Sequence, residues 1–285
     1  MKILRGLSEM SAWSCERSAS GKTIALVPTM GCFHEGHLSL MRHARRFADY
    51  VVVTLFVNPL QFGPREDFAR YPRDFDRDAA LAAANGVDVV FAPDPADMYP
   101  PGYQTHITVD QLSQGLCGRN RPGHFSGVTT VVAKLFHIVR PNVAVFGSKD
   151  FQQLAVIRRM LEDLNWDIKI IAHPVVREAD GLAMSSRNIY LSAAERSSAL
   201  CLSRAIKHAR QLVGQGLREA TTILSELRDL IAADQAVQIE YVNVVDRFNL
   251  SDQAVVDQDS VLLLAVRIGH TRLIDNGRLI EGEVG

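Results

Sequence analysis

Short apolar segments alternate with helical patterns through about the first 175 residues, and this alternation constrains the fold more than any other feature. Residues 50–57 (Y-V-V-V-T-L-F-V) form a nearly continuous apolar run that ends at an Asn-Pro pair. Such runs are typical of strands buried on both faces of a parallel sheet. We predict strands at 23–27, 50–57, 87–91, 143–146 and 167–171, and helices at 37–48, 75–85, 127–140 and 150–165. Strands that alternate with helices indicate an α/β fold whose parallel sheet is covered on both faces.

The last third of the chain has a different pattern. Two helices are predicted at 192–213 and 218–233, followed by strands at 237–245, 260–266 and 271–274. This is typical of a smaller α+β unit. Residues 177–188 between the two regions are polar and contain glycine, so we expect one domain at 1–178 and a second at 179–285.

Composition excludes several classes of protein. The net charge of −1 gives no bulk positive charge for coating nucleic acid. The fully apolar runs reach six residues, as at 261–266, whereas a membrane-spanning helix needs about 20. The four cysteines form no C-x-x-C pair, and the first residues show no secretory pattern. We expect a cytoplasmic protein with neither nucleic-acid nor membrane partners.

Polar segments follow the predicted strands at residues 28–37, 58–63, 147–153 and 175–188. Right-handed crossovers place the loops after parallel strands at one edge of the sheet, where ligands bind in such folds. We therefore expect these segments to line one site. A P-loop, a G-x-G-x-x-G fingerprint and a G-x-S-x-G elbow are absent from the sequence.

His34 and His37 lie three residues apart at the start of a predicted helix. Their imidazoles share one side of the first turn, where unpaired amides and the helix dipole favour an anion such as phosphate. Gly31 and Gly36 allow a ligand to approach the backbone closely. Two alternatives stay open: the histidines lie on the surface near a helix cap, or they bind a metal that needs a third ligand.

Other polar residues suit a nucleotide and a small polar acid. Lys149 follows a strand and can contact phosphate as a point charge, although many loop lysines are merely solvated. Ser185, Ser186 and Arg187 offer two hydroxyls and a guanidinium, a weak signal on its own. The Gln61 and Gln153 amides both donate and accept, as hydroxyls and a carboxylate require, although either could be a surface residue.

Taken together, six motifs in order resemble a known family. They are P-T-M-G…H-E-G-H (28–37), F-V-N-P-L-Q-F (56–62), R-P-G-H-F (121–125), K-D-F-Q-Q (149–153), D-G-L-A-M-S-S-R-N (180–188) and R-L-I-D-N (272–276). This set closely resembles the pantothenate synthetases, or pantoate–β-alanine ligases. The His34–His37 element resembles the H-I-G-H motif of nucleotidyltransferases and class I synthetases, and residues 184–187 resemble their K-M-S-K-S loop.

The resemblance implies a Rossmann-like, doubly wound fold and a reaction in which ATP drives the condensation of (R)-pantoate with β-alanine. Pantoyl-adenylate is the implied intermediate, AMP and diphosphate are the by-products, and the pathway is coenzyme A biosynthesis. Mg²⁺ would be held mainly through the ATP phosphates, so no direct metal ligand is named. The resemblance also implies a homodimer and a C-terminal domain that closes as a lid.

The resemblance assigns roles residue by residue. His37, His34 and Lys149 act on the phosphates. Gln61 and Gln153 hold pantoate, with Asn58 and Arg121 as weaker substrate contacts. ATP is expected to contact Met30, Gly31, Cys32, Phe33, His34, Glu35, Gly36, His37, Gly147, Ser148, Lys149, Asp150, Val176, Met184, Ser185, Ser186 and Arg187.

One residue departs from the family pattern: Ser148 stands where glutamate is usual, and we expect this to alter local hydrogen bonding while leaving the ATP chemistry intact. Two other functions are compatible with the same residues. One is a nucleotidyltransferase that acts on a phosphorylated acceptor, although the two glutamines suit such an acceptor less well than arginine or lysine. The other is a catalytically silent module that binds a nucleotide or a metal.

Overall fold

A computed structural model describes residues 1–64 and 66–280 of the chain. Contacts within the chain divide it into two compact units. Unit 1 comprises Met1–Ser148 and Val156–Pro174, and unit 2 comprises Lys149–Ala155 and the described residues from Val175 onward. The division at 178/179 that the sequence favours remains a prediction about independent domains.

Unit 1 contains, among its described residues, a six-stranded sheet in the order β1-β4-β3-β2-β5-β6, and every pairing is parallel. Strand β2 is central: β3 and β4 follow on one side of it, and β5 and β6 follow on the other. The order therefore reverses between β2 and β5, which is where ligands bind in open parallel sheets. The strands are β1 (Lys2–Leu4), β2 (Ile24–Val27), β3 (Tyr50–Thr54), β4 (Val89–Phe91), β5 (Val143–Gly147) and β6 (Lys169–His173).

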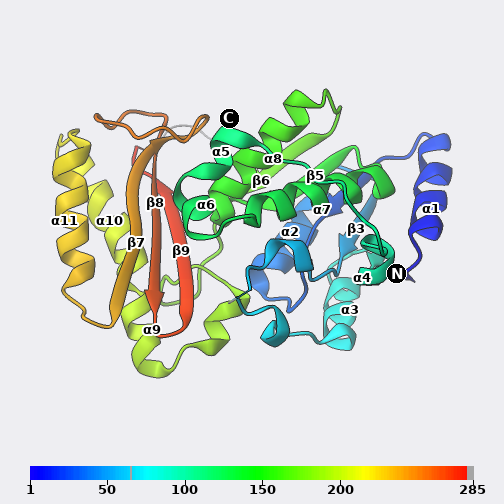
Figure 1. Cartoon of the computed structure of the whole chain (residues 1–285), viewed down its shortest axis with the longest axis horizontal. Helices are drawn as coiled ribbons and strands as arrows, with labels where there is room; N and C mark the ends of the chain where they lie inside the picture. The colour runs from blue at the N-terminus through cyan, green and yellow to red at the C-terminus, as the bar shows by residue number, and fades with distance from the viewer. Residues whose placement is uncertain (65, 281–285) are drawn as a thin grey trace. The chain divides into compact units, whose positions relative to one another are not determined.

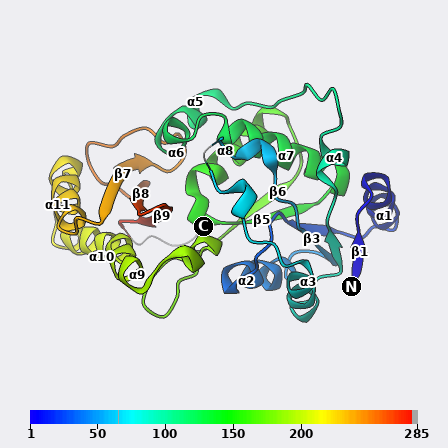
Figure 2. The ribbon, with the colours of Figure 1, turned by 60° about the horizontal axis from the view of Figure 1, so that its bottom comes forward.

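Helices cover both faces of this sheet (Figures 1 and 2). Val51 and Val53 of β3 pack with Met41 of α2 in one hydrophobic cluster. Alternate residues of a strand point to opposite faces, so Tyr50 lies on the other side, where its ring contacts Trp13 of α1 at 5.4 Å. The longer helices of this region are α1 (Leu7–Ala19), α2 (Glu35–Ala44), α3 (Phe75–Ala84), α7 (His124–Val139) and α8 (Phe151–Asp163).

Shorter elements connect them. The short α-helices are α4 (Pro95–Met98), α5 (Asp110–Gln114) and α6 (Leu116–Asn120), and the 3₁₀ turns are η1 (Pro59–Gln61), η2 (Phe68–Arg70), η3 (Ser148–Asp150) and η4 (Ser186–Tyr190).

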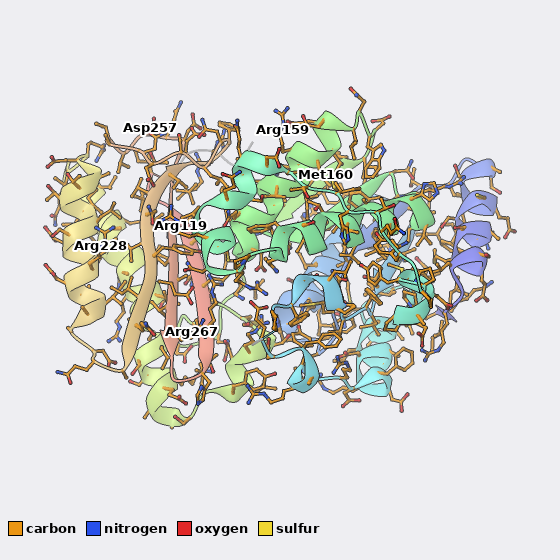
Figure 3. The ribbon with its side chains drawn as sticks, in the orientation of Figure 1. Arg119, Arg159, Met160, Arg228, Asp257 and Arg267 are labelled. Carbon is orange, nitrogen blue, oxygen red and sulfur yellow. The ribbon has the colours of Figure 1, made fainter. Side chains whose placement is uncertain are left out.

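Unit 2 is an antiparallel sheet with helices on one face (Figure 1). Its elements are α9 (Ala193–Ala199), α10 (Cys201–Gly214), α11 (Ala220–Ala232), β7 (Val237–Asp246), β8 (Ser260–Ile268) and β9 (Thr271–Arg278). Leu202 of α10, Ile223 of α11 and Leu264 of β8 are fully buried in its core. Arg228 of α11, labelled in Figure 3, donates to the carbonyl oxygen of Val242 on β7 at 3.0 Å.

The predicted α/β class with a doubly wound parallel sheet is confirmed, as is the smaller α+β region. Two differences are local. The strand predicted at 50–57 is Tyr50–Thr54, although the amide of Phe56 still bonds to the carbonyl oxygen of Thr29 at 3.2 Å in the register of the β2–β3 pairing. The helix predicted at 192–213 is two helices, α9 and α10, and Leu200 is the C-cap of the first and the N-cap of the second.

Candidate active site

The loop after β2 leads into α2 and carries the two histidines. Gly31 and Cys32 have φ angles of +87° and +52°, so the backbone turns through the left-handed region. Asp78 on α3 accepts hydrogen bonds from the backbone N–H groups of Cys32 at 2.6 Å and Phe33 at 2.8 Å. The side chain of Asp78 thereby fixes a loop that is 45 residues away in sequence.

The two histidines lie together, as the sequence predicts. His34 is the N-cap of α2, and its backbone N–H donates to His37 Nδ1 at 3.4 Å. The two imidazole centroids are 4.1 Å apart, and the His37 ring also contacts Phe33, which is buried. Both rings are therefore at the N-terminus of a helix that follows the central strand β2, a position that favours anions.

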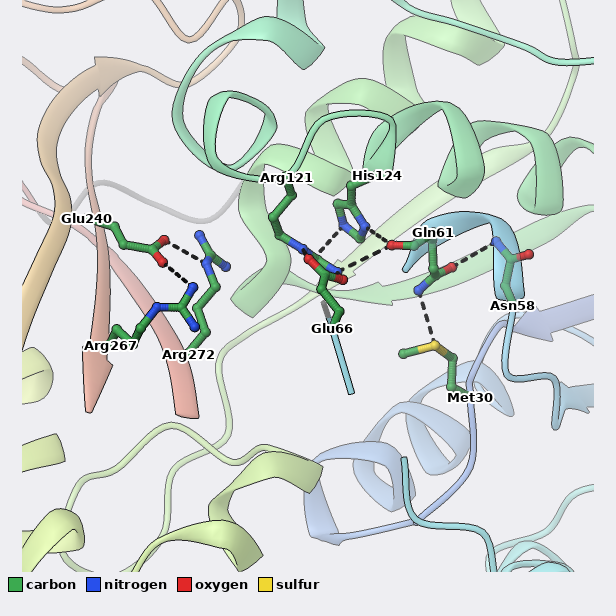
Figure 4. Close-up of polar contacts among 9 residues, drawn as sticks. All are labelled: Met30, Asn58, Gln61, Glu66, Arg121, His124, Glu240, Arg267 and Arg272. Atoms are coloured by element: carbon green, nitrogen blue, oxygen red, sulfur yellow. Dashed lines mark hydrogen bonds and ion pairs between the residues drawn. The ribbon is translucent and has the colours of Figure 1, made fainter. Parts of the chain in front are cut away.

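Gln61 and Asn58, in the loop after β3, form one buried amide network (Figure 4). Asn58 Nδ2 donates to Gln61 Oε1 at 3.1 Å and to the carbonyl oxygen of Gly127 on α7 at 3.0 Å. Tyr99 Oη donates to Asn58 Oδ1 at 2.8 Å. Gln61 Nε2 donates to Met30 Sδ at 3.1 Å, and a thioether is a weak acceptor. The Gln61 amide is thus oriented by Asn58, while its N–H group contacts a weak partner.

Arg121 supports the same loop (Figure 4). Its guanidinium binds both carboxylate oxygens of Glu66 at 2.6 Å and donates to His124 Nε2 at 2.9 Å. Because a guanidinium only donates, His124 Nδ1 carries the proton and donates to the carbonyl oxygen of Gln61 at 2.8 Å. Burial tends to raise the pKa of Glu66, but the hydrogen bonds and charge of Arg121 outweigh it and hold that pKa below its usual range.

In unit 2, Lys149 is held by the C-terminal strand. Asn276 Nδ2 on β9 donates to the carbonyl oxygen of Lys149 at 2.8 Å. Asp275 beside it is buried, pairs with Arg177 at 2.7 Å and accepts from the backbone N–H of Asn276. Burial lowers the pKa of the Lys149 ammonium, Asp150 and Asp275 oppose that shift, and Arg187 and Arg272 add to it.

The segment with Val176, Met184, Ser185, Ser186 and Arg187 is also ordered within unit 2. Met184 N–H donates to the carbonyl oxygen of Val176 at 2.9 Å, and Ser185 Oγ accepts from Arg187 N–H at 3.3 Å. A separate ionic group on the sheet of this unit joins Glu240 to Arg267 at 3.0 Å and to Arg272 at 2.7 Å (Figure 4).

The predicted residues therefore form two groups, one in each unit. Unit 1 holds Met30 to His37 with Asn58, Gln61, Arg121, Gly147 and Ser148, and unit 2 holds Lys149, Asp150, Gln153, Val176 and Met184 to Arg187. Their meeting at one rim stays a prediction.

Sequence reasoning missed Asp78, Glu66 and Tyr99 as supporting residues, because each acts through a tertiary hydrogen bond that leaves no spacing pattern. His124 was visible only as part of the R-P-G-H-F motif. Among the described residues no three His, Cys, Asp or Glu side chains are grouped so as to hold a metal ion. No helix in the described part of the chain has the length and apolar character needed to cross a membrane.

Comparison with known proteins decides the family. The family model for pantoate-beta-alanine ligase matches residues 2–278. The chain belongs to the pantoate–β-alanine ligase family. The pantothenate synthetase of Heliobacterium modesticaldum is 55% identical over 276 residues, which cover 97% of this chain and 98% of that protein. The enzyme from Geobacter sulfurreducens is 52% identical over the same length, with the same coverage of each chain.

Solved structures agree with this assignment. The pantothenate synthetase of Thermus thermophilus is 41% identical, superposes with a TM-score of 0.94, and the match covers 99% of this chain and 100% of that one. The pantoate–β-alanine ligase of Francisella tularensis is 32% identical, with a TM-score of 0.82 and 99% of each chain covered. That structure is described as complexed with beta-gamma ATP and β-alanine.

Membership confirms the main functional prediction: this pantoate–β-alanine ligase is an enzyme that joins pantoate to β-alanine. It also decides against the nucleotidyltransferase and the silent module that the same residues left open. Membership does not settle the roles of individual site residues.

Proposed function

We propose that this ligase uses ATP to activate pantoate as an acyl-adenylate in the loop after β2 and then transfers the pantoyl group to β-alanine. The observation that carries the proposal is the paired histidines: His34 and His37 lie at the N-terminus of α2, directly after β2 at the point where the strand order reverses. The Francisella relative, described with beta-gamma ATP and β-alanine, supports it.

In the first step, a carboxylate oxygen of pantoate forms a bond to the α-phosphorus of ATP, and the bond from that phosphorus to the bridging oxygen breaks. The bonding electrons leave with diphosphate. A carboxylate with a pKa near 4 is already ionised at neutral pH, so this step needs no general base. The protein contributes positioning and cations, and we assign these roles to His34, His37 and Lys149, with Ser185, Ser186 and Arg187 as further phosphate contacts.

In the second step, the neutral amine of β-alanine attacks the acyl carbon, AMP leaves with the bonding electrons, and the amine loses a proton to water. Gln61 suits pantoate because its N–H group donates to a sulfur atom and is fixed in direction by Asn58. A pantoate oxygen is a stronger acceptor than a thioether, so it displaces Met30 without loss. We assign Gln153, in the first turn of α8, to the same substrate.

Mg²⁺ completes the ATP complex in this proposal. This ion usually keeps its waters and binds through substrate phosphates with one or two carboxylates. It supplies charge neutralisation at the phosphates, and we propose no protein cage for it.

Pantoate-dependent exchange between ATP and diphosphate tests the first step. We expect exchange in the unaltered enzyme without β-alanine, and a loss of at least about a hundredfold in His37→Ala and Lys149→Ala. AMP should appear in stoichiometric amounts only when β-alanine is present. Exchange that ignores pantoate, or that survives both substitutions, contradicts the proposal.

We also propose a homodimer and a C-terminal unit that closes over the nucleotide. Both follow from the family resemblance, and the lid is supported by the ordered segment that carries Ser185 to Arg187 in unit 2. Analytical ultracentrifugation tests the dimer. Small-angle scattering with and without ATP tests closure, and identical profiles contradict it.

A further inference from the structure

Asp78 is a buried acid that the reaction itself does not require. It lies on α3 with 2% of its surface exposed, yet it reaches the loop after β2. Its Oδ2 accepts from Cys32 N–H at 2.6 Å and its Oδ1 from Phe33 N–H at 2.8 Å. Gly31 has a φ angle of +87°, which favours glycine, and a Cβ placed on it would be 3.0 Å from Asp78 Oδ2.

A second residue of α3 holds the same peptide. Arg77 Nη2 donates to the carbonyl oxygen of Phe33 at 3.1 Å, and its guanidinium also pairs with Asp78 at 3.5 Å. The N–H and the carbonyl of Phe33 are therefore both bound to α3. Phe33 directly precedes His34, so α3 determines where the histidine pair begins.

Consecutive backbone N–H groups that point to one spot form a typical anion-binding concavity. Here the anion is a side chain of the protein itself. The N–H groups of Cys32 and Phe33 are occupied, so a phosphate must bind elsewhere on the loop.

We propose that Asp78 is a positioning residue: its carboxylate occupies the backbone N–H groups of Cys32 and Phe33, fixes the loop before His34, and leaves ATP phosphates to His34, His37 and the N-terminus of α2. This inference rests on the proposed binding of ATP to that loop. It changes the role of Cys32 and Phe33 from phosphate contacts to structural groups.

Burial disfavours the charged form of Asp78. Burial raises the pKa of Asp78, an effect reinforced by Asp74, although the Phe33 and Cys32 N–H groups and Arg77 oppose it. A pKa raised in the folded state contributes stability at low pH that is lost as the pH rises through that value. The ionised carboxylate is therefore less favourable here than on an exposed aspartate, as is common for acids at functional sites.

Asp78→Asn tests the inference, because an amide has one acceptor and must turn a donor toward the second N–H group. We expect the KM for ATP to rise about tenfold or more, while the KM for β-alanine stays within about twofold. Asp88→Asn is the matched control: Asp88 also accepts from a backbone N–H, that of Val51 at 2.7 Å, and pairs with Arg45 in the same unit. It should change the melting temperature without changing the KM for ATP.

His37→Ala distinguishes a failure of the Asp78 inference from a failure of ATP binding at the loop after β2. If it raises the KM for ATP and Asp78→Asn does not, the inference about Asp78 is wrong while the loop assignment stands. If His37→Ala leaves the KM for ATP unchanged, the loop assignment itself fails and the inference fails with it. If Asp78→Asn changes melting temperature and every KM together, Asp78 is structural only.

Amide hydrogen exchange in the unaltered enzyme gives a test that needs no variant. We expect the N–H groups of Cys32 and Phe33 to be protected without ATP and to change little when ATP–Mg²⁺ is added. The N–H groups of Glu35 and Gly36 should gain protection instead. ATP-dependent protection confined to Cys32 and Phe33 would mean that phosphate displaces Asp78, and would overturn the inference.

Discussion

Substituting Gly127 by alanine tests whether the packing of α7 against η1 positions Gln61 for substrate binding. Gly127 is in α7, and a Cβ there would be 2.3 Å from the carbonyl oxygen of Leu60 and 2.6 Å from the backbone N of Gln61. Ordinary carbon–oxygen contacts are about 3.3 Å or longer, so α7 and η1 would have to separate by about 1 Å. The same contact carries the hydrogen bond from Asn58 Nδ2 to the carbonyl oxygen of Gly127.

Two opposing effects determine the size of the change. Alanine is favoured over glycine in a helix by about 1 kcal/mol, but overpacking against rigid backbone typically costs about 1–3 kcal/mol. Weakening the buried Asn58 bond adds about 1 kcal/mol. We therefore expect Gly127→Ala to lower the free energy of unfolding by about 2 kcal/mol. A misplacement of about 1 Å at Gln61 should lower kcat/KM for pantoate by up to about a hundredfold.

Urea unfolding followed by circular dichroism, with steady-state kinetics for each substrate, measures both effects. Gly214→Ala is the matched control, because Gly214 ends α10 and a Cβ placed on it would have no neighbouring atom within 4 Å among the described residues. It should be neutral or slightly stabilising and leave all kinetic constants unchanged. An alanine at 127 that is as stable as the unaltered enzyme, with an unchanged KM for pantoate, would refute the packing argument.

Three further predictions concern single side chains. Asn276→Ala removes the donor to the Lys149 carbonyl and should lower kcat/KM for ATP about tenfold. Circular dichroism should show an intact fold, and unchanged kinetics would contradict the anchoring role of Asn276. Glu66→Gln should lower the free energy of unfolding at neutral pH by about 1–3 kcal/mol. Because Arg121 lowers the pKa of Glu66 below the usual glutamate value of about 4.3, the difference between variant and unaltered enzyme should disappear as the pH falls through that lowered pKa. A difference that persists in acid unfolding curves would contradict this role of the ion pair. Ser148→Glu should change turnover less than about tenfold, and a larger change in either direction would show that position 148 matters more than we argue.

The sequence predicted most strands of the parallel sheet because they lie within or beside apolar runs. The run at 50–57 is apolar throughout, and its core is β3. Strand β4 is as short as β1, but it lies in the apolar run that predicted a strand at 87–91. Strand β1 (K-I-L) lies in no such run, and α1 carries serines at several positions with few buried apolar residues, so neither was predicted. Short elements depend on tertiary neighbours more than on their own sequence.

The candidate site shows the same limit. His34 and His37 were predictable because their spacing on a helix is a local property. Asp78 was not, since its partners lie 45 and 46 residues away and are backbone N–H groups, which nearly any residue type provides. Likewise the donor that fixes Lys149 comes from Asn276, 127 residues later in the chain.

The charge of the Lys149 ammonium is unfavourable in the folded enzyme, and this bears on the proposed role of Lys149 at the phosphates. Burial lowers the pKa of its ammonium, and Arg187 and Arg272 oppose its charge as well. In the proposed ATP complex each of these unfavourable effects would be reduced, because phosphate oxygens would supply negative charge in place of the water that burial removes. The carbonyl bond from Asn276 keeps the lysine in place while its charge is costly. A group held ready in an unfavourable state stabilises charge more effectively as it develops than a solvated lysine, whose surrounding water must reorganise.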